Sequence, residues 1–528
     1  MPRVTLNGRV VEVQKGATLL EAASNAGIGI PTLCHLQGLE PFTSCMICAV
    51  KEMTTGRLLP ACSTPAVEGM VVETDSAEVR LHRKRVLELL MGEHAGDCEA
   101  PCQMTCPARM EIPVMLRQIA EGRIQEALMT IREAIALPGV VGHICPAPCE
   151  KGCRRGRHDA PVSICLMERF VAAGTDVEGD PPAVAGSGRR VAIVGAGPAG
   201  LAAAYYLAKA GHGCTIFDEQ AAPGGPLRYQ IPATALPLEV LERDVEVIRR
   251  LGVEFKMNTR IEPGAGLTAL KTAYDAVVLA PGKGGGPLSA WGLAATERGF
   301  AVEGGTFRSS DPMIFTGGDA VHAGKLAVRA MAHGRIMAGA INQYLSGAPV
   351  TGEAGSFQSR LGRLREAELA EYVRDAEPAP RLAAPRDPAD LIVPAAATQE
   401  ARRCLRCDCR RAKSCRLRDY ATEYNVDHSS LKTDGRLTVS MAVSTPVAGS
   451  ACGDRVVYEA GKCIKCGICV RIAATAEDGL GLAFVGRGFG TVMAAPFNAT
   501  LAAGMGEKAG ECVRHCPTGA LAWERSDK

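Results

Sequence analysis

Along the middle of the chain, short apolar runs alternate with longer helical patterns. Val191–Val194 is an apolar run, a helical segment of small residues follows it, and a second apolar run covers Cys214–Phe217. Residues 236–255 carry an amphipathic helical pattern and then a strand pattern, and residues 328–345 are again helical. Strands that alternate with helices predict an α/β domain with a parallel sheet over residues 189–347.

A glycine-rich turn joins the first apolar run to its helix. Gly195, Gly197 and Gly200 form the pattern G-x-G-x-x-G, and Asp218 ends the second apolar run about 20 residues later. The glycines allow a tight turn, close approach of the backbone to a pyrophosphate and close packing of helix on sheet, while the helix N-terminus attracts the phosphates. Strand, turn, helix and acid together predict dinucleotide binding; the alternative is a glycine-rich turn with only a structural role.

Two later motifs indicate which dinucleotide binds. Pro223-Gly224-Gly225 follows the acid, and Thr316-Gly317-Gly318-Asp319 follows another apolar run. These motifs resemble the second and third signatures of flavoproteins with two dinucleotide domains, most closely the small subunit of glutamate synthase and the matching part of dihydropyrimidine dehydrogenase. The resemblance implies FAD, with Asp319 at its ribityl and pyrophosphate region. The expected cofactor-binding residues are Gly195, Gly197, Pro198, Ala199, Gly200, Asp218, Glu219, Gly225, Gly318 and Asp319.

The second dinucleotide domain of these flavoproteins, which holds NAD(P)H, has no counterpart in the sequence. It would follow residues 274–282, but the chain passes from Gly282 to Met313 through roughly thirty residues, whereas a whole domain needs about a hundred. We therefore expect the nicotinamide-binding domain to be missing.

Composition narrows the functional classes. The 528 residues have room for several domains, and the net charge of +2 gives no general attraction to nucleic acid or to a membrane surface. No apolar run is long enough to cross a membrane and the N-terminus lacks a signal-peptide pattern, so a cytoplasmic location is expected. The 22 cysteines cluster in C-x2-C-type motifs, which predicts zinc or iron–sulfur sites rather than disulfides.

The first cysteine set lies in residues 1–78, which begin with a strand–turn–strand pattern. Its spacing, C-x10-C-x2-C-x13-C, comprises Cys34, Cys45, Cys48 and Cys62. This region resembles the [2Fe–2S] ferredoxin domain at the start of the large subunit of respiratory complex I and of related hydrogenase subunits, which implies a β-grasp fold; zinc is the alternative. In complex I a helix like residues 79–98 leads to a His–Cys pair that ligates a [4Fe–4S] cluster. His94 and Cys98 match that pair, although His94 could equally be an ordinary imidazole.

Residues 79–175 resemble the helical two-cluster domain that precedes the flavin domain of glutamate synthase. The resemblance implies one [4Fe–4S] cluster on Cys98, Cys102 and Cys153, with His94 near the position of a missing cysteine. A second cluster would use Cys106, Cys145 and Cys149. Its fourth ligand in relatives is Gln or Glu, which falls at Glu168. Cys165 lies one helical turn away and competes for this role, and we favour Glu168.

Three segments follow the flavin domain. Residues 348–402 are rich in Ala, Pro and Arg, and we expect an extended connector with surface helices and solvated charges. Residues 403–425 hold a compact four-thiolate set for which zinc and [4Fe–4S] both remain open, namely Cys404, Cys407, Cys409 and Cys415. Residues 450–528 resemble the bacterial-type ferredoxin fold and imply one [4Fe–4S] cluster on Cys463, Cys466, Cys469 and Cys516, with Cys512 left over.

These features predict a multidomain α/β and α+β iron–sulfur flavoprotein with one FAD, one [2Fe–2S] cluster and three to four [4Fe–4S] clusters. Such a chain of centres is typical of an electron-transfer subunit of a larger oxidoreductase. The expected partners are a catalytic redox subunit, of the formate dehydrogenase, hydrogenase or diaphorase type, and ferredoxin. The alternative is a self-sufficient flavoenzyme that uses NAD(P)H or a small substrate, although the sequence shows no catalytic acid–base set near the flavin motifs. A zinc-stabilised scaffold is the remaining, non-redox alternative.

Overall fold

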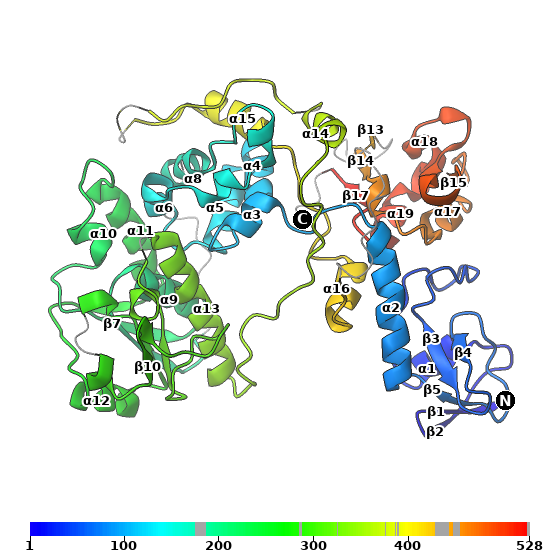
Figure 1. The fold of residues 1–528 in the computed structure, drawn as a ribbon, viewed down its shortest axis with the longest axis horizontal. Coiled ribbons are helices and arrows are strands. Elements are labelled where there is room, and N and C mark those ends of the chain that lie inside the picture. The colour runs from blue at the N-terminus through cyan, green and yellow to red at the C-terminus, as the bar shows by residue number, and fades with distance from the viewer. Residues whose placement is uncertain are drawn as a thin grey trace. The chain divides into compact units, whose positions relative to one another are not determined.

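A computed structural model describes residues 1–174, 186–284, 288–324, 326–374, 376–385, 387, 390–427, 443–446 and 455–524 (Figure 1). Residues 174–188 are polar and rich in Gly and Pro, which predicts a linker, and most of them lie outside this range. The chain divides into two compact units, each built from separated stretches of sequence. Unit 1 comprises residues 1–99, 355–375 and 407–528, and unit 2 comprises residues 100–354 and 376–406. Among the described residues, no helix has both the length and the apolar character needed to cross a lipid bilayer.

Unit 1 begins with a five-stranded mixed sheet in the order β2-β1-β5-β3-β4, in which β1 and β5 are parallel. Helix α1 packs on this sheet through Leu19, Ala22 and Ala23. Thr18 and Glu21 start the helix with a capping box. The elements are β1 (Arg3–Leu6), β2 (Arg9–Glu12), α1 (Leu19–Asn25), β3 (Ala49–Glu52), β4 (Leu58–Pro60) and β5 (Val71–Glu73). The strand–turn–strand pattern predicted at the N-terminus is confirmed.

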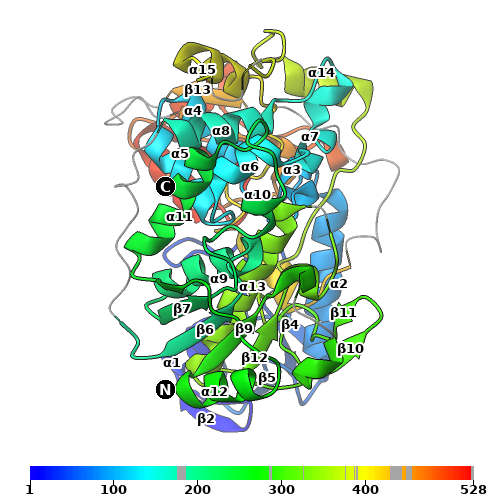
Figure 2. The ribbon, with the colours of Figure 1, turned by 90° about the vertical axis from the view of Figure 1, so that its left-hand side faces the viewer.

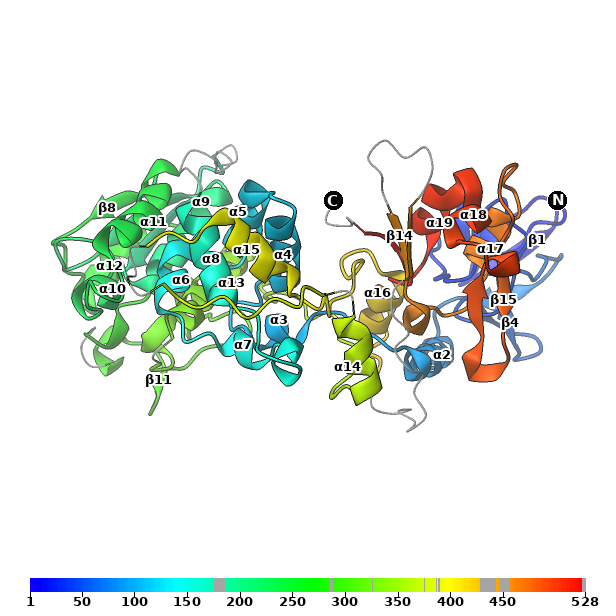
Figure 3. The same ribbon diagram turned by 90° about the horizontal axis from the view of Figure 1, so that it is seen from above.

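The rest of unit 1 joins the N-terminal region to the C-terminal segments of the chain, which lie together in Figure 3. One hydrophobic core runs from Cys34 and Ile47 through the long helix α2 to Cys466 and Ile468. The elements that build this part are α2 (Ala77–Glu93), α14 (Glu366–Val373), α16 (Arg416–Glu423), β13 (Val443–Pro446), β14 (Arg455–Tyr458), α17 (Ile468–Ala473), β15 (Ala483–Val485), β16 (Val492–Ala494), α18 (Leu501–Met505), α19 (Ala509–His515) and β17 (Leu521–Trp523).

Unit 2 begins with a group of helices that carries cysteines at its turns and helix ends. Helices α4 and α5 pack on each other, as do α6 and α8. Their buried faces carry apolar residues such as Met115, Ile131 and Met167. The helices are α3 (Pro101–Thr105), α4 (Ile112–Ala120), α5 (Ile124–Arg132), α6 (Pro138–Ile144), α7 (Pro148–Lys151) and α8 (Ile164–Ala173).

A parallel five-stranded sheet in the order β12-β9-β6-β7-β8 forms the rest of unit 2. Figure 2 shows β7, β6, β9 and β12 side by side with α9 and α13, and α13 packs closely on α9. This confirms the strands and helices predicted for residues 189–347. The elements are β6 (Arg190–Val194), α9 (Pro198–Lys209), β7 (Gly213–Phe217), α10 (Pro226–Tyr229), α11 (Leu238–Arg250), β8 (Glu254–Lys256), α12 (Ala265–Ala273), β9 (Ala276–Leu279), β10 (Ala295–Thr296), β11 (Gly299–Phe300), β12 (Ile314–Thr316) and α13 (Ala327–Leu345).

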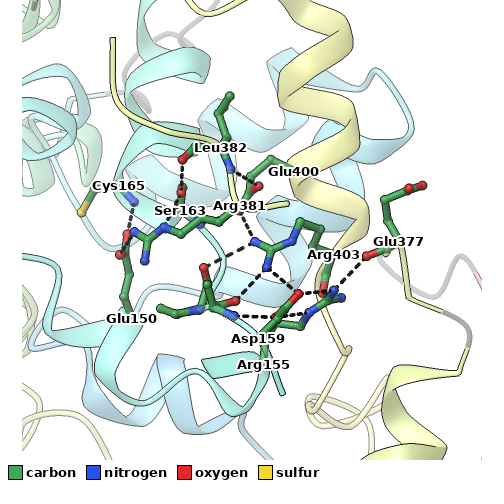
Figure 4. Close-up of polar contacts among 12 residues, drawn as sticks. Glu150, Arg155, Asp159, Ser163, Cys165, Glu377, Arg381, Leu382, Glu400 and Arg403 are labelled. Atoms are coloured by element: carbon green, nitrogen blue, oxygen red, sulfur yellow. Dashed lines mark hydrogen bonds and ion pairs between the residues drawn. The ribbon is translucent and has the colours of Figure 1, made fainter. Parts of the chain in front are cut away.

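The segment 376–406 returns to the helical part of unit 2, where α15 (Pro394–Arg402) packs on α4. The expectation of solvated charges in the connector is wrong for Glu400, which is 2% exposed and pairs with Arg403, a residue just beyond the connector that is 0% exposed. Figure 4 shows the network that buries them. Arg403 pairs with Glu400 at 2.8 Å and with Asp159 at 3.1 Å, and Glu400 accepts from the Ser163 amide at 2.8 Å. Buried charges persist because each has a partner, which the sequence pattern alone does not reveal.

Candidate functional site

The dinucleotide fingerprint opens into a cavity of about 820 Å³ at the carboxyl ends of the parallel strands of unit 2. This position is the usual ligand site of an open α/β sheet. Nine of the ten predicted cofactor residues line the cavity: Gly195, Gly197, Pro198, Ala199, Asp218, Glu219, Gly225, Gly318 and Asp319. The tenth, Gly200, has a packing role, since a Cβ at this position would lie 1.9 Å from the Gly195 carbonyl oxygen.

Two details of the turn fit a bound dinucleotide. Gly195 has φ of +104°, which a side chain would strain, and helix α9 begins directly after Gly197 with its N-terminus at the cavity. The Asp218 carboxylate accepts from the backbone N–H of Ala196 at 2.6 Å and of Gln220 at 2.8 Å. These bonds fix the carboxylate at the cavity wall, and each oxygen keeps a lone pair for a further donor.

His333 on α13 supports the part of the cavity wall that Gly318 forms, and no sequence motif identified it as a site residue. Its Nδ1 accepts from the Gly318 amide at 3.2 Å, and its ring stacks on Phe307 with centroids 4.4 Å apart. Burial, with a smaller contribution from Arg329, lowers the pKa of His333 to about 4. A neutral imidazole therefore holds the turn that carries Asp319. Its only sequence signal is a histidine in the helix that follows the motif.

A group of thiols in the helical part of unit 2 borders this cavity. Cys145 and Pro146 line the cavity itself. The thiol of Cys165 hydrogen-bonds to both Cys145 and Cys149, and the contact lowers the pKa of Cys145 to about 7. Cys106 lies close enough to Glu168 and Cys149 for their negative charges to raise the pKa of its thiol. The structure thus brings together all of the residues predicted for this cluster, and the competitor Cys165 with them.

Glu168 is buried in this group, with 2% exposure, and its Oε2 has no hydrogen-bond partner among the described residues. Burial raises the pKa of Glu168 well above its ordinary value, and the nearby Cys145 and Glu150 add to the shift. Burial likewise raises the pKa of the Cys106 thiol to about 12. A metal centre would compensate these costs, because ligation favours the deprotonated forms.

The four cysteines predicted to hold the [2Fe–2S] cluster form two contacting pairs in unit 1. The Cys45 thiol donates to Cys34 and lowers the pKa of Cys34 to about 5, and the Cys48 thiol does the same for Cys62, whose pKa falls to about 7. All four are buried. Two pairs are the arrangement that two irons require, because each tetrahedral iron that shares two sulfides accepts two thiolates.

The C-terminal set in unit 1 shows electrostatic interactions but no thiol–thiol hydrogen bond among the described residues. Cys469 interacts electrostatically with Cys463, Cys466 and Cys516. Burial is the main cause that raises the pKa of Cys463, of Cys466 (to about 12) and of Cys469. One thiolate per iron, at separated corners, is the arrangement that a [4Fe–4S] cube requires. The leftover Cys512 donates its thiol to the Cys469 carbonyl oxygen at 3.6 Å.

The remaining predicted ligands divide between the units. Cys102, Cys153 and Cys404 belong to unit 2, whereas His94, Cys98, Cys407, Cys409 and Cys415 belong to unit 1. His94 ends helix α2, and the next residue, Ala95, donates its amide to the Gly461 carbonyl at 2.7 Å, close to Cys463. Among the described residues, no three His, Cys, Asp or Glu side chains converge closely enough to hold a single metal ion. The role of His94 stays a prediction.

Three family descriptions match parts of the chain. Residues 2–77 match "2Fe-2S iron-sulfur cluster binding domain", residues 90–179 match domain II of dihydropyrimidine dehydrogenase with a 4Fe-4S cluster, and residues 193–231 match "NAD(P)-binding Rossmann-like domain". The chain therefore contains a [2Fe–2S] domain, a [4Fe–4S] domain and a Rossmann-like dinucleotide-binding region, as the sequence predicts.

Similar proteins cover only part of the chain. The beta subunit of the NADP(+)-dependent formate dehydrogenase of Moorella thermoacetica is 39% identical over 38% of this chain and 32% of its own length. The PreT subunit of NAD-dependent dihydropyrimidine dehydrogenase of Salmonella typhimurium is 37% identical over 37% of this chain and 49% of its own length. The chain thus spans 32% to 49% of the length of these relatives. A crystal structure of an NAD+-reducing [NiFe]-hydrogenase shares 33% identity over 18% of this chain and 39% of its own, with a TM-score of 0.17.

Proposed function

We propose that the chain is an electron-transfer subunit of a multi-subunit oxidoreductase and that unit 2 passes electrons between FAD and an adjacent [4Fe–4S] cluster. The observation that carries this proposal is the position of Cys145, which belongs to the thiol group of unit 2 and also lines the dinucleotide cavity. A cluster ligand at the cavity wall brings two redox centres close together without an intervening domain. Relatives named as beta subunits of larger enzymes support the same role.

FAD is supported by the residues of the cavity. The cavity volume of about 820 Å³ is within the range of ligand sites, and its wall includes the N-terminus of α9, Asp218 and Asp319, which supports contacts to phosphate, ribose and ribityl groups. Between β9 and β12 the chain has only residues 280–313, which is too few for a second dinucleotide domain. A flavin exchanges electrons in pairs or singly, whereas a cluster exchanges them singly.

For the cluster beside the cavity we propose the ligands Cys106, Cys145, Cys149 and Glu168. The thiol of Cys165 is in hydrogen-bond contact with two of these cysteines, whereas the corners of a [4Fe–4S] cube are separated. Glu168 instead offers a buried oxygen that has no partner among the described residues. The arrangement favours Glu168 as the fourth ligand and Cys165 as a thiol that packs against the site.

The partner we propose is a catalytic redox subunit of the formate dehydrogenase, hydrogenase or diaphorase type, with ferredoxin as a one-electron donor or acceptor. The alternative is a self-sufficient oxidoreductase that binds NAD(P)H or another small substrate at the exposed flavin. The match of residues 193–231 to an NAD(P)-binding description favours this alternative. The two functions differ in whether NADPH alone can deliver electrons.

The experiment compares electron donors on the full chain with its flavin and clusters bound, under anaerobic conditions. We expect one equivalent of NADPH to leave the flavin absorbance unchanged and reduced ferredoxin to bleach it. Cys106→Ser should slow bleaching by ferredoxin at least tenfold, on the order of 1.4 kcal/mol in activation free energy, because it removes a ligand of the cluster beside the flavin. The matched control is Cys214→Ser, a buried thiol of β7 that bonds only the His212 carbonyl among the described residues. Bleaching by NADPH would reject the proposal in favour of the alternative.

A further inference from the structure

Cys98 lies in unit 1 in a position built to hold a metal ligand. Its amide donates to the Ser359 carbonyl at 3.2 Å, and the Ser359 amide donates to the Cys98 sulfur at 3.4 Å. The same N–H to sulfur bond occurs at Cys463, whose sulfur accepts from the Lys465 amide at 3.4 Å. Such bonds stabilise a thiolate more than a thiol, and they are a feature of iron–sulfur ligation.

Cys409 comes alongside Cys98 although more than three hundred residues separate them. The Cys409 amide donates to the Cys98 carbonyl oxygen at 3.1 Å. The Cys409 sulfur is buried against the turn that follows Cys516, where a Cβ on Gly519 would lie 2.1 Å from it. Backbone pairing on one side and the glycine on the other fix the direction in which this sulfur points.

Cys415 completes the group. Its sulfur lies 3.9 Å from the Pro517 carbonyl oxygen, on the same turn that holds Cys409. Cys415 interacts electrostatically with Cys409, Cys98 and Cys516, in decreasing order. These three sulfurs are coupled at long range, unlike the contacting pairs of Cys34 with Cys45 and of Cys48 with Cys62. In lacking a thiol–thiol hydrogen bond among the described residues, the three resemble the C-terminal set rather than the two-iron set.

We propose that Cys98, Cys409 and Cys415 hold a [4Fe–4S] cluster of their own within unit 1, next to the cluster of Cys463, Cys466, Cys469 and Cys516. This grouping differs from both groupings that the sequence suggests, because it takes Cys98 from the set of Cys102 and Cys153, and takes Cys409 and Cys415 from the set of Cys404. Cys407, on the loop that carries Cys409, is the nearest further cysteine in the sequence of unit 1 for the fourth corner.

The inference rests on the proposed electron-transfer function. It also predicts the order in which the clusters of unit 1 follow one another. Cys466 interacts electrostatically with Cys34, and Arg471 ties the two regions by donating to the Cys34 carbonyl at 2.7 Å. Cys516 in turn interacts with Cys415. The C-terminal cluster would therefore stand between the [2Fe–2S] centre and the new centre, so that unit 1 holds a row of three.

Iron content tests whether two cysteines serve the same cluster. Full-length chain is assembled anaerobically with Cys98→Ser, Cys415→Ser or both, and iron per chain and the EPR spectrum of the reduced protein are measured. Each single variant should lose about four irons and the same EPR signal, and the double variant should lose about four and not about eight. The matched control is Cys466→Ser with Cys415→Ser, which should lose about eight because those ligands belong to different clusters.

A loss of about eight irons in the Cys98/Cys415 pair would overturn the grouping, as would single variants that lose no iron or lose zinc. Gly519→Ala is a second probe that leaves every cysteine in place. A free Cys409 thiol could rotate away from the new methyl group, but a ligand could not. We expect this variant to lose the EPR signal that Cys98→Ser loses and to keep the signal that Cys466→Ser loses; an unchanged spectrum would contradict the proposal. An iron-poor wild-type chain would instead reject the electron-transfer function itself.

Discussion

In unit 2 a thiol group lies at the wall of a large cavity, whereas in unit 1 the thiol groups lie next to one another. Cys145 is shared between the cavity and its thiol group, while Cys466 couples to Cys34 and Cys415 couples to Cys516. The first arrangement suits the exchange of electrons with a bound dinucleotide, and the second suits passage from centre to centre. Under the proposed function, unit 2 would exchange electrons with the dinucleotide and unit 1 would pass them from centre to centre.

The units also hold their thiol groups by different means. Unit 1 shares one hydrophobic core between its N-terminal and C-terminal parts, which includes Cys34 and Cys466. Unit 2 adds a buried polar network, in which Arg403 and Glu400 of the returning segment hold Asp159 and Ser163 between α7 and α8. Polar networks depend on every member, so unit 2 is expected to be the more sensitive to single charge removals.

The largest effect is expected from Gly200→Ala, which should abolish flavin binding in the cavity of unit 2 and leave unit 1 intact. The new Cβ would lie 1.9 Å from the Gly195 carbonyl oxygen, so the turn must move, at a cost of roughly 3 kcal/mol or more. Flavin per chain, measured by absorbance, should fall at least tenfold while the EPR signals of the unit 1 clusters persist. Gly339→Ala on α13 is the control, because its Cβ meets no atom within 4 Å and should retain flavin. A Gly200→Ala chain with full flavin would contradict the role of this turn.

Arg403→Met should destabilise unit 2 by about 3–5 kcal/mol, because the buried Glu400 loses the cation that pairs with it, whereas Asp159 keeps its ion pair with Arg155. Thermal unfolding and limited proteolysis of residues 376–402 would show the loss. Arg250→Ala removes an exposed ion pair with Glu246 and should change stability by less than about 0.5 kcal/mol. Equal effects of the two changes would mean that the network does not hold the returning segment.

A pH dependence is expected from Asp244 of α11, which accepts from the Val140 amide at 2.9 Å and so supports the helix that ends at Cys145. Burial raises the pKa of Asp244 to about 7. Between about pH 4 and pH 7 the folded chain keeps a proton that the unfolded chain has lost, so stability falls as pH rises through this range. Asp244→Asn should reduce the fall between pH 5 and pH 8 by an amount on the order of 1–3 kcal/mol, measured by chemical unfolding. An identical pH profile in the variant would contradict the assignment.

The smallest effect is expected from a change of Cys165. This change tests which residue is the fourth ligand of the cluster beside the cavity. Cys165→Ser should leave iron content unchanged and shift one EPR signal only slightly, because this thiol packs against the cluster. Glu168→Ala should lose or strongly alter that same signal. The reverse result would assign the fourth ligand to Cys165.

Local sequence patterns predicted much of the fold. The features they missed depend on contacts between separate segments of the chain. The strands before Gly195 and Asp218 and the helices of residues 236–255 and 328–345 follow from short-range periodicity. Arg403 was missed because its burial depends on the distant Asp159, and His333 was missed because its role depends on contacts with Phe307 and Gly318 that no motif records. Cys98 pairs with the distant Cys409, and spacing along the sequence cannot reveal such a partner.

Metal and flavin analysis of the anaerobically purified chain tests the central claim most directly. If the thiol groups hold iron–sulfur clusters beside and beyond a flavin, each chain should carry one FAD and about 14 to 18 irons, from one two-iron cluster and three or four four-iron clusters. Fewer than about 6 irons per chain, or zinc in their place, would contradict the account.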